Sequence, residues 1–205
     1  QDFDQAIRLD PKFAMAFKNR GLAHHEKRNY DRAIADFDQA IKLNPGYAAA
    51  FYNRGNAYFD KGDFDRAIAD YDEAIKLNPN DATAFHNRGT AYANKQSYDQ
   101  AIADLSQAIK LNPQNALAYN DRGTAYGYKG ELDLAIRDFD NAVKLDPRNA
   151  LFFYNRGLAY RNKGETDRAI ADYDQSIRLN ANYTSALFAR GDAYLSKREF
   201  DRAIE

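Results

Sequence analysis

The chain has 205 residues, of which 44% are hydrophobic, and this is enough apolar material for a packed core. Its 29 basic and 30 acidic residues nearly cancel, so the whole chain carries no strong field for nucleic acid or an anionic membrane. The absence of cysteine excludes disulfides and thiolate metal sites. No stretch approaches the roughly 18 apolar residues of a membrane span. With no targeting signal visible, we expect a cytoplasmic location.

An internal period of 34 residues organises the sequence, and the triplet Asn-Arg-Gly at 53–55 is one of its markers. We count repeat positions from Ala14. Chains with such a period stack into an extended body of repeats instead of closing a globule. The expected divisions are the C-terminal half of a preceding repeat at 1–13, five full repeats at 14–47, 48–81, 82–115, 116–149 and 150–183, and a truncated sixth repeat at 184–205.

Each repeat predicts two helices and no strand, because apolar residues recur at helical spacing and nowhere alternate strictly. In chain order, a first helix is followed by a polar turn around positions 14–16, such as Lys61-Gly62-Asp63, and then by a second helix. Proline at position 32 stops the second helix or opens the next repeat. These prolines are Pro11, Pro45, Pro79, Pro113 and Pro147, and Ala181 is the exception.

The expected core is built from small and large residues at fixed positions. In the first helix of the second full repeat, Phe51, Gly55 and Tyr58 form one stripe at positions 4, 8 and 11. A glycine in a helix interior costs about 1 kcal/mol. Its recurrence at position 8 therefore indicates the close approach of a neighbouring helix. Alanine at position 20 and a large ring at position 24 of most repeats predict tight packing of the second helix.

These residues, with alanine at position 27 and proline at position 32, resemble the tetratricopeptide repeat over the whole chain. The resemblance implies an all-α fold, a right-handed superhelical solenoid of antiparallel helix pairs. It also implies a concave groove lined by the first helices, a non-enzymatic role and a protein or peptide partner. Two positions depart from the family pattern. Position 7 is arginine where the family usually has leucine, and His24 replaces tyrosine at position 11 of the first full repeat.

The groove face is expected to carry positions 2, 6, 9 and 13 of the first helix, with positions 5 and 12 beside them. Position 6 is nearly constant, whereas the neighbouring positions vary from repeat to repeat. Such variation along one face indicates a surface that recognises a ligand. The candidate groove residues are Asn19, Asn53, Asn87, Asp121 and Asn155 at position 6, and Lys18, Tyr52, Asn56, His86, Thr90, Asn120, Thr124, Tyr128, Tyr154 and Arg161 around them.

An asparagine amide offers an acceptor and donors, so a row of them could pair with the N–H and C=O groups of an extended peptide. A similar ladder occurs in tetratricopeptide superhelices, including that of the protein O-linked N-acetylglucosamine transferases. Asparagine at position 6 also belongs to the common repeat sequence and can be structural. The carboxylate clamp of chaperone-binding members is rejected. Its cationic fork is missing: when the clamp motif is aligned to begin at Lys18, Thr83 and Asn87 stand where it requires basic residues.

The arginine at position 7 is predicted to point away from the groove, towards the second helix. An aspartate follows sixteen residues after each of the first five arginines, at position 23. A buried pair of this kind would be costly to break. The predicted structural ion pairs are Arg20–Asp36, Arg54–Asp70, Arg88–Asp104, Arg122–Asp138 and Arg156–Asp172.

Other chemistry is not expected. The adjacent His24 and His25 should point to different faces, which argues against a metal site. No nucleophile–base pattern and no phosphate-cradling loop occurs, so no catalytic residue and no cofactor is predicted. Lysine at position 14, as in Lys61, is expected to favour the dipole at the end of the first helix. Charged groove residues are two positive and four negative, whereas a nucleic-acid groove should be basic. They are Lys18, Arg161, Glu26, Asp60, Asp121 and Asp192.

The alternative function is that of a self-associating scaffold. Both ends of the sequence fall at repeat position 22, inside a second helix, and they carry apolar residues such as Phe3 and Phe200. Two copies placed head to tail could therefore nearly rebuild one helix. We expect such stacking to be a heterologous contact that need not close.

Overall fold

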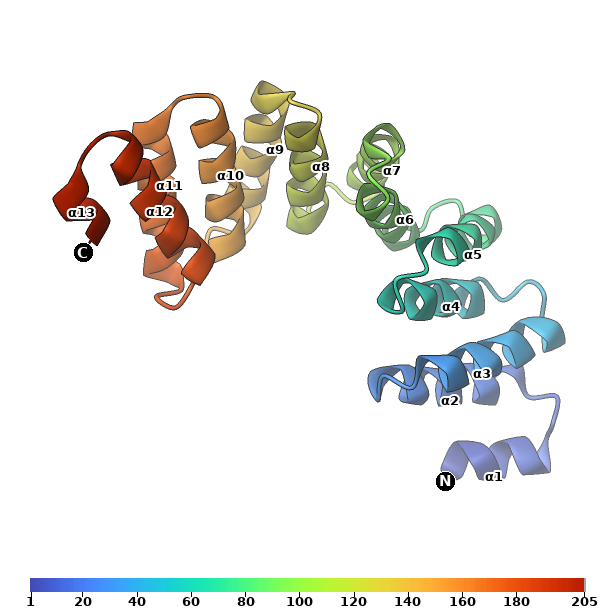
Figure 1. Cartoon of the computed structure of the whole chain (residues 1–205). Coiled ribbons are helices and arrows are strands. Elements are labelled where there is room, and N and C mark those ends of the chain that lie inside the picture. Colours follow the sequence, from blue (N-terminus) through green and yellow to red (C-terminus); the bar gives the residue numbers. More distant parts are fainter. Residues whose placement is uncertain (205) are drawn as a thin grey trace. The chain divides into compact units, whose positions relative to one another are not determined.

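The computed structural model describes residues 1–204, and all the regular elements in this range are α-helices. The predicted all-α class is therefore confirmed (Figure 1). In order, the helices are α1 (Asp2–Leu9), α2 (Ala14–Glu26), α3 (Tyr30–Leu43), α4 (Ala48–Asp60), α5 (Phe64–Leu77), α6 (Ala82–Asn94), α7 (Tyr98–Leu111), α8 (Ala116–Tyr128), α9 (Leu132–Leu145), α10 (Ala150–Asn162), α11 (Thr166–Leu179), α12 (Thr184–Ser196) and α13 (Phe200–Ile204).

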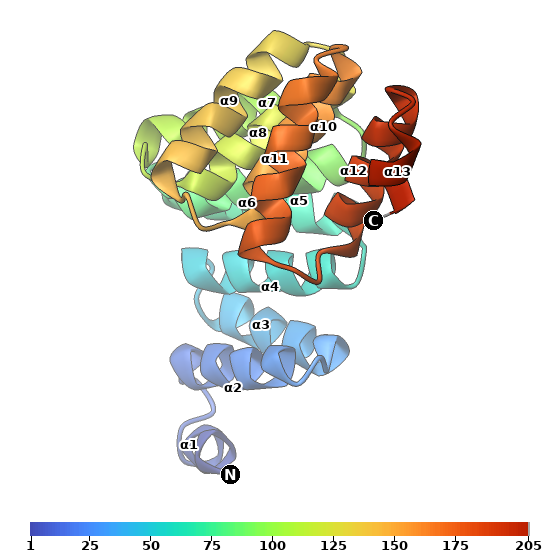
Figure 2. The ribbon, with the colours of Figure 1, turned by 90° about the vertical axis from the view of Figure 1, so that its left-hand side faces the viewer.

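The helices form two compact units, one of Gln1–Leu111 with α1–α7 and one of Asn112–Glu205 with α8–α13. Within each unit, every helix packs against the next one in the chain. Figures 1 and 2 show α2, α3 and α4 side by side in the first unit. The even-numbered helices are the predicted first helices, and the odd-numbered ones from α3 onward are the second helices.

First helices approach other first helices more closely than second helices approach other second helices. Within the first unit, α2 contacts α4 and α4 contacts α6, and within the second, α8 contacts α10 and α10 contacts α12. Across residues 1–204, no such contact joins one second helix to another. A stack whose first helices are closer together than its second helices is curved towards the first helices. The inner face of each unit is therefore lined by first helices.

In four of the full repeats the position-8 glycine lies where a ring from the second helix presses against the first helix, and in the third full repeat Leu105 takes the place of the ring. A Cβ atom added to Gly55 would lie 2.8 Å from the Tyr71 ring, and one added to Gly157 would lie 2.6 Å from the Tyr173 ring. Both rings are almost completely buried. Alanines on both sides of these rings, such as Ala67 and Ala91, are fully buried and allow the close packing.

The turn between the two helices of a repeat contains one residue in the left-handed backbone region. Gly62, Gly130 and Gly164 occupy it with φ near 80°. In other repeats, arginine or glutamine takes the same position with φ of about 60°, as at Gln96. Glycine adopts this region without a steric penalty, whereas other residues do not. The compact turn is therefore maintained in every repeat, and only some repeats have the residue best suited to it.

The two buried tyrosines at position 24 differ in what their hydroxyls meet. The Tyr71 hydroxyl donates a hydrogen bond to Asn56 Oδ1 at 2.8 Å. At the equivalent place in the fifth full repeat stands Leu158, which packs against the cluster containing Tyr173 and offers no acceptor. Among the described residues, Tyr173 Oη is buried without a hydrogen-bond partner. Burial raises the pKa of Tyr173 to about 12.

Tyr173→Phe is expected to raise the free energy of unfolding by about 1 kcal/mol at neutral pH, because it removes a buried unpaired hydroxyl. The unfolded state loses the Tyr173 proton near pH 10 and the folded state near pH 12. The stability linked to this proton is thus present below pH 10 and is lost as pH rises from about 10 to about 12, by about 1.4 kcal/mol per pH unit. The variant should lack this loss. Urea unfolding at neutral and alkaline pH measures both effects.

The matched control is Tyr71→Phe, which breaks the hydrogen bond to Asn56 and should lower stability by about 1 kcal/mol. Equal effects of the two substitutions at neutral pH would contradict the assignment of an unpaired hydroxyl to Tyr173.

Candidate functional site

The arginine at position 7 connects three helices. Arg54 of α4 donates two hydrogen bonds to Asp70 of α5, from Nε to Oδ2 at 2.8 Å and from Nη2 to Oδ1 at 2.6 Å. Its Nη1 donates to Asp38 of α3 at 2.5 Å. The guanidinium carbon lies 5.6 Å from the centre of the Phe51 ring, one turn earlier in the helix. The arginine therefore replaces an apolar packing residue with a fork held between two carboxylates.

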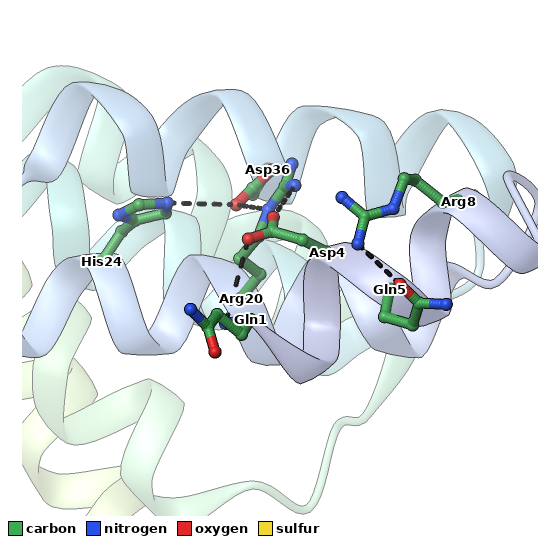
Figure 3. Close-up of polar contacts among 7 residues, drawn as sticks. All are labelled: Gln1, Asp4, Gln5, Arg8, Arg20, His24 and Asp36. Carbon is green, nitrogen blue, oxygen red and sulfur yellow. Dashed lines mark hydrogen bonds and ion pairs between the residues drawn. The ribbon is translucent and has the colours of Figure 1, made fainter.

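The same arrangement begins at the first helix pair, where Figure 3 shows Arg20 between Asp4 of α1 and Asp36 of α3. Arg20 donates to Asp36 at 2.9 and 2.6 Å and to Asp4 at 2.7 Å. In all five full repeats the structure places the arginine in a two-bond contact with the aspartate sixteen residues later. The pairs are Arg20–Asp36, Arg54–Asp70, Arg88–Asp104, Arg122–Asp138 and Arg156–Asp172.

The position-23 aspartates are buried, with exposed fractions of 3–7%. Burial raises the pKa of Asp70, and the hydrogen bonds and charge of Arg54 oppose that rise. The hydrogen bonds to Asp70 in turn raise the pKa of Arg54, so the guanidinium stays charged. The aspartate at position 25 of the preceding repeat, such as Asp38, is about half exposed. We call the whole series of these contacts the arginine–aspartate ladder.

A second series of ion pairs was not predicted. Lysine at position 14 contacts an aspartate in the first turn of the preceding second helix, thirty residues earlier in the chain. Lys163 Nζ lies 2.7 Å from Asp133 Oδ1, and Lys197 Nζ lies 2.8 Å from Asp167 Oδ1. Lys61 pairs with Asp31 in the same way. The sequence contained the signal for these pairs, because the lysine and the aspartate both recur with the period of 34 residues. The predicted interaction of the lysine with the helix dipole did not include a partner from another repeat.

The position-6 asparagines belong to the first helices, and two of them are held by neighbouring side chains. The Asn87 amide nitrogen donates to Tyr52 Oη at 2.9 Å and to Asn56 Oδ1 at 3.0 Å. Both amide hydrogens of Asn87 are therefore used inside the first unit. Its carbonyl oxygen makes no hydrogen bond with the described residues, so Asn87 presents an acceptor alone.

In the second unit, the Asn155 amide nitrogen donates to Asn120 Oδ1 at 2.8 Å, and Asn120 donates to Asp121 Oδ1 at 3.0 Å. Asn120 is only 3% exposed. The predicted groove residue Asn120 therefore orients Asn155 from below the surface and is not itself accessible to a ligand. The physical reason is that one amide can donate to Asp121 and accept from Asn155 at once.

The other position-6 asparagines are not restrained in this way. The side chains of Asn19 and Asn53 make no hydrogen bond within residues 1–204, and both are half-buried on α2 and α4. Lys18, next to Asn19, is also half-buried and without an ion pair in this range. Asn19 and Asn53 thus keep both the donor and the acceptor of the amide available.

The remaining predicted groove residues have mixed environments. The hydroxyls of Thr90 and Thr124 donate to the carbonyl oxygens of His86 and Asn120, one turn earlier. Arg161 pairs with Asp192 at 3.0 Å. The Tyr154 ring lies 6.1 Å from Tyr173 and 5.2 Å from Tyr183, whereas Tyr128 is 70% exposed. His86 is half-buried. The structure therefore brings Tyr52 to Asn87, and the hydroxyls of Thr90 and Thr124 bond to their own helices.

The two adjacent histidines have separate surroundings. His24 Nε2 lies 3.9 Å from Asp36 at the arginine–aspartate ladder (Figure 3). His25 Nε2 lies 2.8 Å from Asp60 Oδ2, an ion-pair distance without the alignment of a hydrogen bond. No group of three metal-binding side chains occurs within residues 1–204. In the same range, none of the helices combines the length and apolarity needed to cross a membrane.

Comparison with known proteins agrees with this geometry. A family model described as "TPR repeat" matches residues 24–62, 55–96 and 91–130. A second, described as "Tetratricopeptide repeat", matches 120–184 and 160–205. No curated protein matches the chain.

Several solved structures are similar. One is YrrB, described as a TPR protein with an unusual peptide-binding site. It is 26% identical, with a TM-score of 0.77 over 93% of this chain and 98% of YrrB. MamA is 27% identical, with a TM-score of 0.74 over 80% of this chain and 96% of MamA. Pseudomonas aeruginosa pilF shares 16% identity and a TM-score of 0.81, covering 100% of this chain and 90% of its own, which shows likeness of fold alone. Together with the consecutive helix pairs, these matches show that the chain belongs to the tetratricopeptide-repeat family.

Proposed function

We propose that this protein is a non-enzymatic scaffold that binds an extended segment of a partner protein along the inner face of its first helices. The observation that carries the proposal is the state of the position-6 amides in the first unit. Asn53 keeps its donor and acceptor unpaired, and the Asn87 amide is held by Tyr52 and Asn56 through its nitrogen, which leaves its carbonyl oxygen unpaired. Groups that are polar, oriented and unpaired on an inner face suit a ligand that supplies hydrogen bonds.

The geometry refines how such a segment would be held. A free amide such as that of Asn53 can accept from a peptide N–H and donate to a peptide C=O. Asn87 and Asn155 can accept at Oδ1, and the Asn87 nitrogen has no hydrogen left to donate. Contacts to backbone groups would be independent of sequence. The neighbouring tyrosines would add apolar area with a polar end, as in other peptide-binding surfaces. The described peptide-binding site of YrrB supports the class of ligand.

The test begins with selection of binders from a displayed library of random peptides against the whole chain. Affinity of the best peptide is then measured for the wild type and for Asn53→Ala. Two lost hydrogen bonds at about 0.5–1.5 kcal/mol each predict binding weaker by roughly tenfold or more. Asn141→Ala on α9 is the matched control, since its exposed amide bonds only to the Arg137 carbonyl of its own helix. Its affinity should not change.

Recognition of the peptide backbone can be tested separately from recognition of its side chains. N-methylation of the peptide, one amide at a time, should weaken binding at one position about as much as Asn53→Ala does. Combining that methylation with the substitution should then add nothing, because both remove the same contact. Selected peptides that bind Asn53→Ala and the wild type equally well would contradict the proposal.

A further inference from the structure

A pocket opens between α8, α9 and α10 of the second unit, with a volume of about 200 Å³. Gly127 of α8 leaves one side of it open. Leu132 and Phe139 of α9 and Leu158 and Ala159 of α10 supply apolar walls, and Asn155 lies at the same pocket. All the lining side chains are uncharged. The pocket therefore suits a neutral apolar group and lies beside one of the position-6 asparagines.

The first unit shows what fills the equivalent space in another repeat. There, Phe59 and Phe64 stand at the positions of Gly127 and Leu132. Their ring centres are 5.3 Å apart in an edge-to-face arrangement. Phe59 also packs against the buried cluster of its repeat, together with Tyr52. In the second unit, the corresponding cluster has the same alanines, isoleucine and large ring, with no residue in place of Phe59.

The absence of that ring leaves unoccupied space. A Cβ atom added to Gly127 would meet no heavy atom within 4 Å apart from its chain neighbours and the nearby backbone of its own helix. Glycine is unfavourable inside a helix, and the position imposes no positive φ that would require it. The nearby Phe139 is almost fully buried, so the wall of the pocket is fixed. The gap is therefore shaped by the surrounding repeat for a ring that this chain does not supply there.

We propose that the pocket at Gly127 binds an aromatic side chain of the partner segment, in the place that Phe59 occupies in its own repeat. The inference rests on the proposed function, because the segment would lie along the same face. Asn155 lines the pocket, and its nitrogen is already bonded to Asn120, so its Oδ1 would take a hydrogen bond from the backbone of the residue whose ring is inserted. Edge-to-face contact with Phe139 favours a ring over an aliphatic group.

The probe is N-acetyl-L-phenylalaninamide, titrated into the whole chain labelled with ¹⁵N and followed by two-dimensional NMR. Saturable shifts are expected at the backbone amides of Gly127, Asn155 and Leu158. N-acetyl-L-alaninamide, which has the same backbone groups without the ring, should bind at least roughly tenfold more weakly. Absence of shifts at these amides, or equal shifts from both compounds, overturns the inference.

Variants at Gly127 test whether the probe binds in this pocket. Gly127→Phe and the smaller Gly127→Leu should fill the pocket and remove the shifts. Gly46→Phe, which adds a ring in the turn between α3 and α4, should leave them unchanged. Shifts that persist in a folded Gly127→Phe protein overturn the inference, and the wild-type titration decides the question if both variants unfold. Asn53→Ala should not affect this probe. If the probe binds but no peptide does, the proposed function is contradicted, whereas the inference of an aromatic pocket at Gly127 is retained.

Discussion

Replacing Arg54 with alanine is expected to lower the free energy of unfolding by about 3–5 kcal/mol. The substitution leaves Asp70 buried, with 5% exposure, and without the two hydrogen bonds that Arg54 donates. Burial already raises the pKa of Asp70 against the effect of Arg54. Without the guanidinium, the carboxylate must either remain charged in a poorly solvated place or take up a proton. Equilibrium unfolding in urea, followed by circular dichroism, measures the loss.

Arg190→Ala is the matched control. Arg190 stands at the same repeat position, and its ion pair within residues 1–204 is with Asp174, whose side chain is 39% exposed. Exposed pairs contribute about 0–1 kcal/mol. A double variant, Arg54→Leu with Asp70→Leu, should recover much of the loss, because it leaves no buried unpaired charge. Asp38 also loses its partner, but it is about half exposed and stays hydrated. A cost for Arg54→Ala no larger than that of Arg190→Ala would contradict the assignment.

The arginine–aspartate ladder also explains how repeats are coupled within a unit. Arg54 binds Asp70 of its own repeat and Asp38 of the preceding one. The lysine series adds a further link between successive repeats, as from Lys163 to Asp133. Repeat arrays derive their cooperativity from contacts between nearest neighbours. The guanidiniums of Arg20, Arg54, Arg88 and Arg156 therefore each contribute to the folding of one helix pair and to its attachment to the helix before it.

The sequence alone predicted the repeat fold because small, aromatic and proline residues recur at constant spacing. The same periodicity made Asp70 a candidate partner of Arg54. It did not identify Asp38, because a carboxylate sixteen residues before the arginine belongs to another repeat and competes with many others. Periodicity also says nothing about departures from the repeat. The burial of Asn120 depends on Asn155 and Asp121, and the gap at Gly127 depends on what stands across from it.

The position-8 glycine is the clearest case in which sequence and packing agree, and Gly157→Ala tests it. The new Cβ atom would lie 2.6 Å from Tyr173 Cε1, 2.8 Å from Tyr173 Cδ1 and 3.3 Å from the Ala169 carbonyl oxygen. The tyrosine ring has no exposed surface, so it cannot move aside without disturbing its cluster. Overpacking costs about 1–3 kcal/mol. The change to alanine also raises helix propensity by about 1 kcal/mol, so a net loss of up to about 2 kcal/mol is expected.

Gly191→Ala separates the two contributions, because it makes the same change at the same repeat position. A Cβ atom there would meet its nearest neighbour, the Ala203 carbonyl oxygen, at 3.7 Å, which is an ordinary contact. Only the gain in helix propensity remains, so this variant should be more stable than the wild type by up to about 1 kcal/mol. The two substitutions are thus expected to have opposite signs in thermal or urea unfolding. Stabilisation by both would show that the Tyr173 ring can yield, and that its approach to Gly157 does not require glycine.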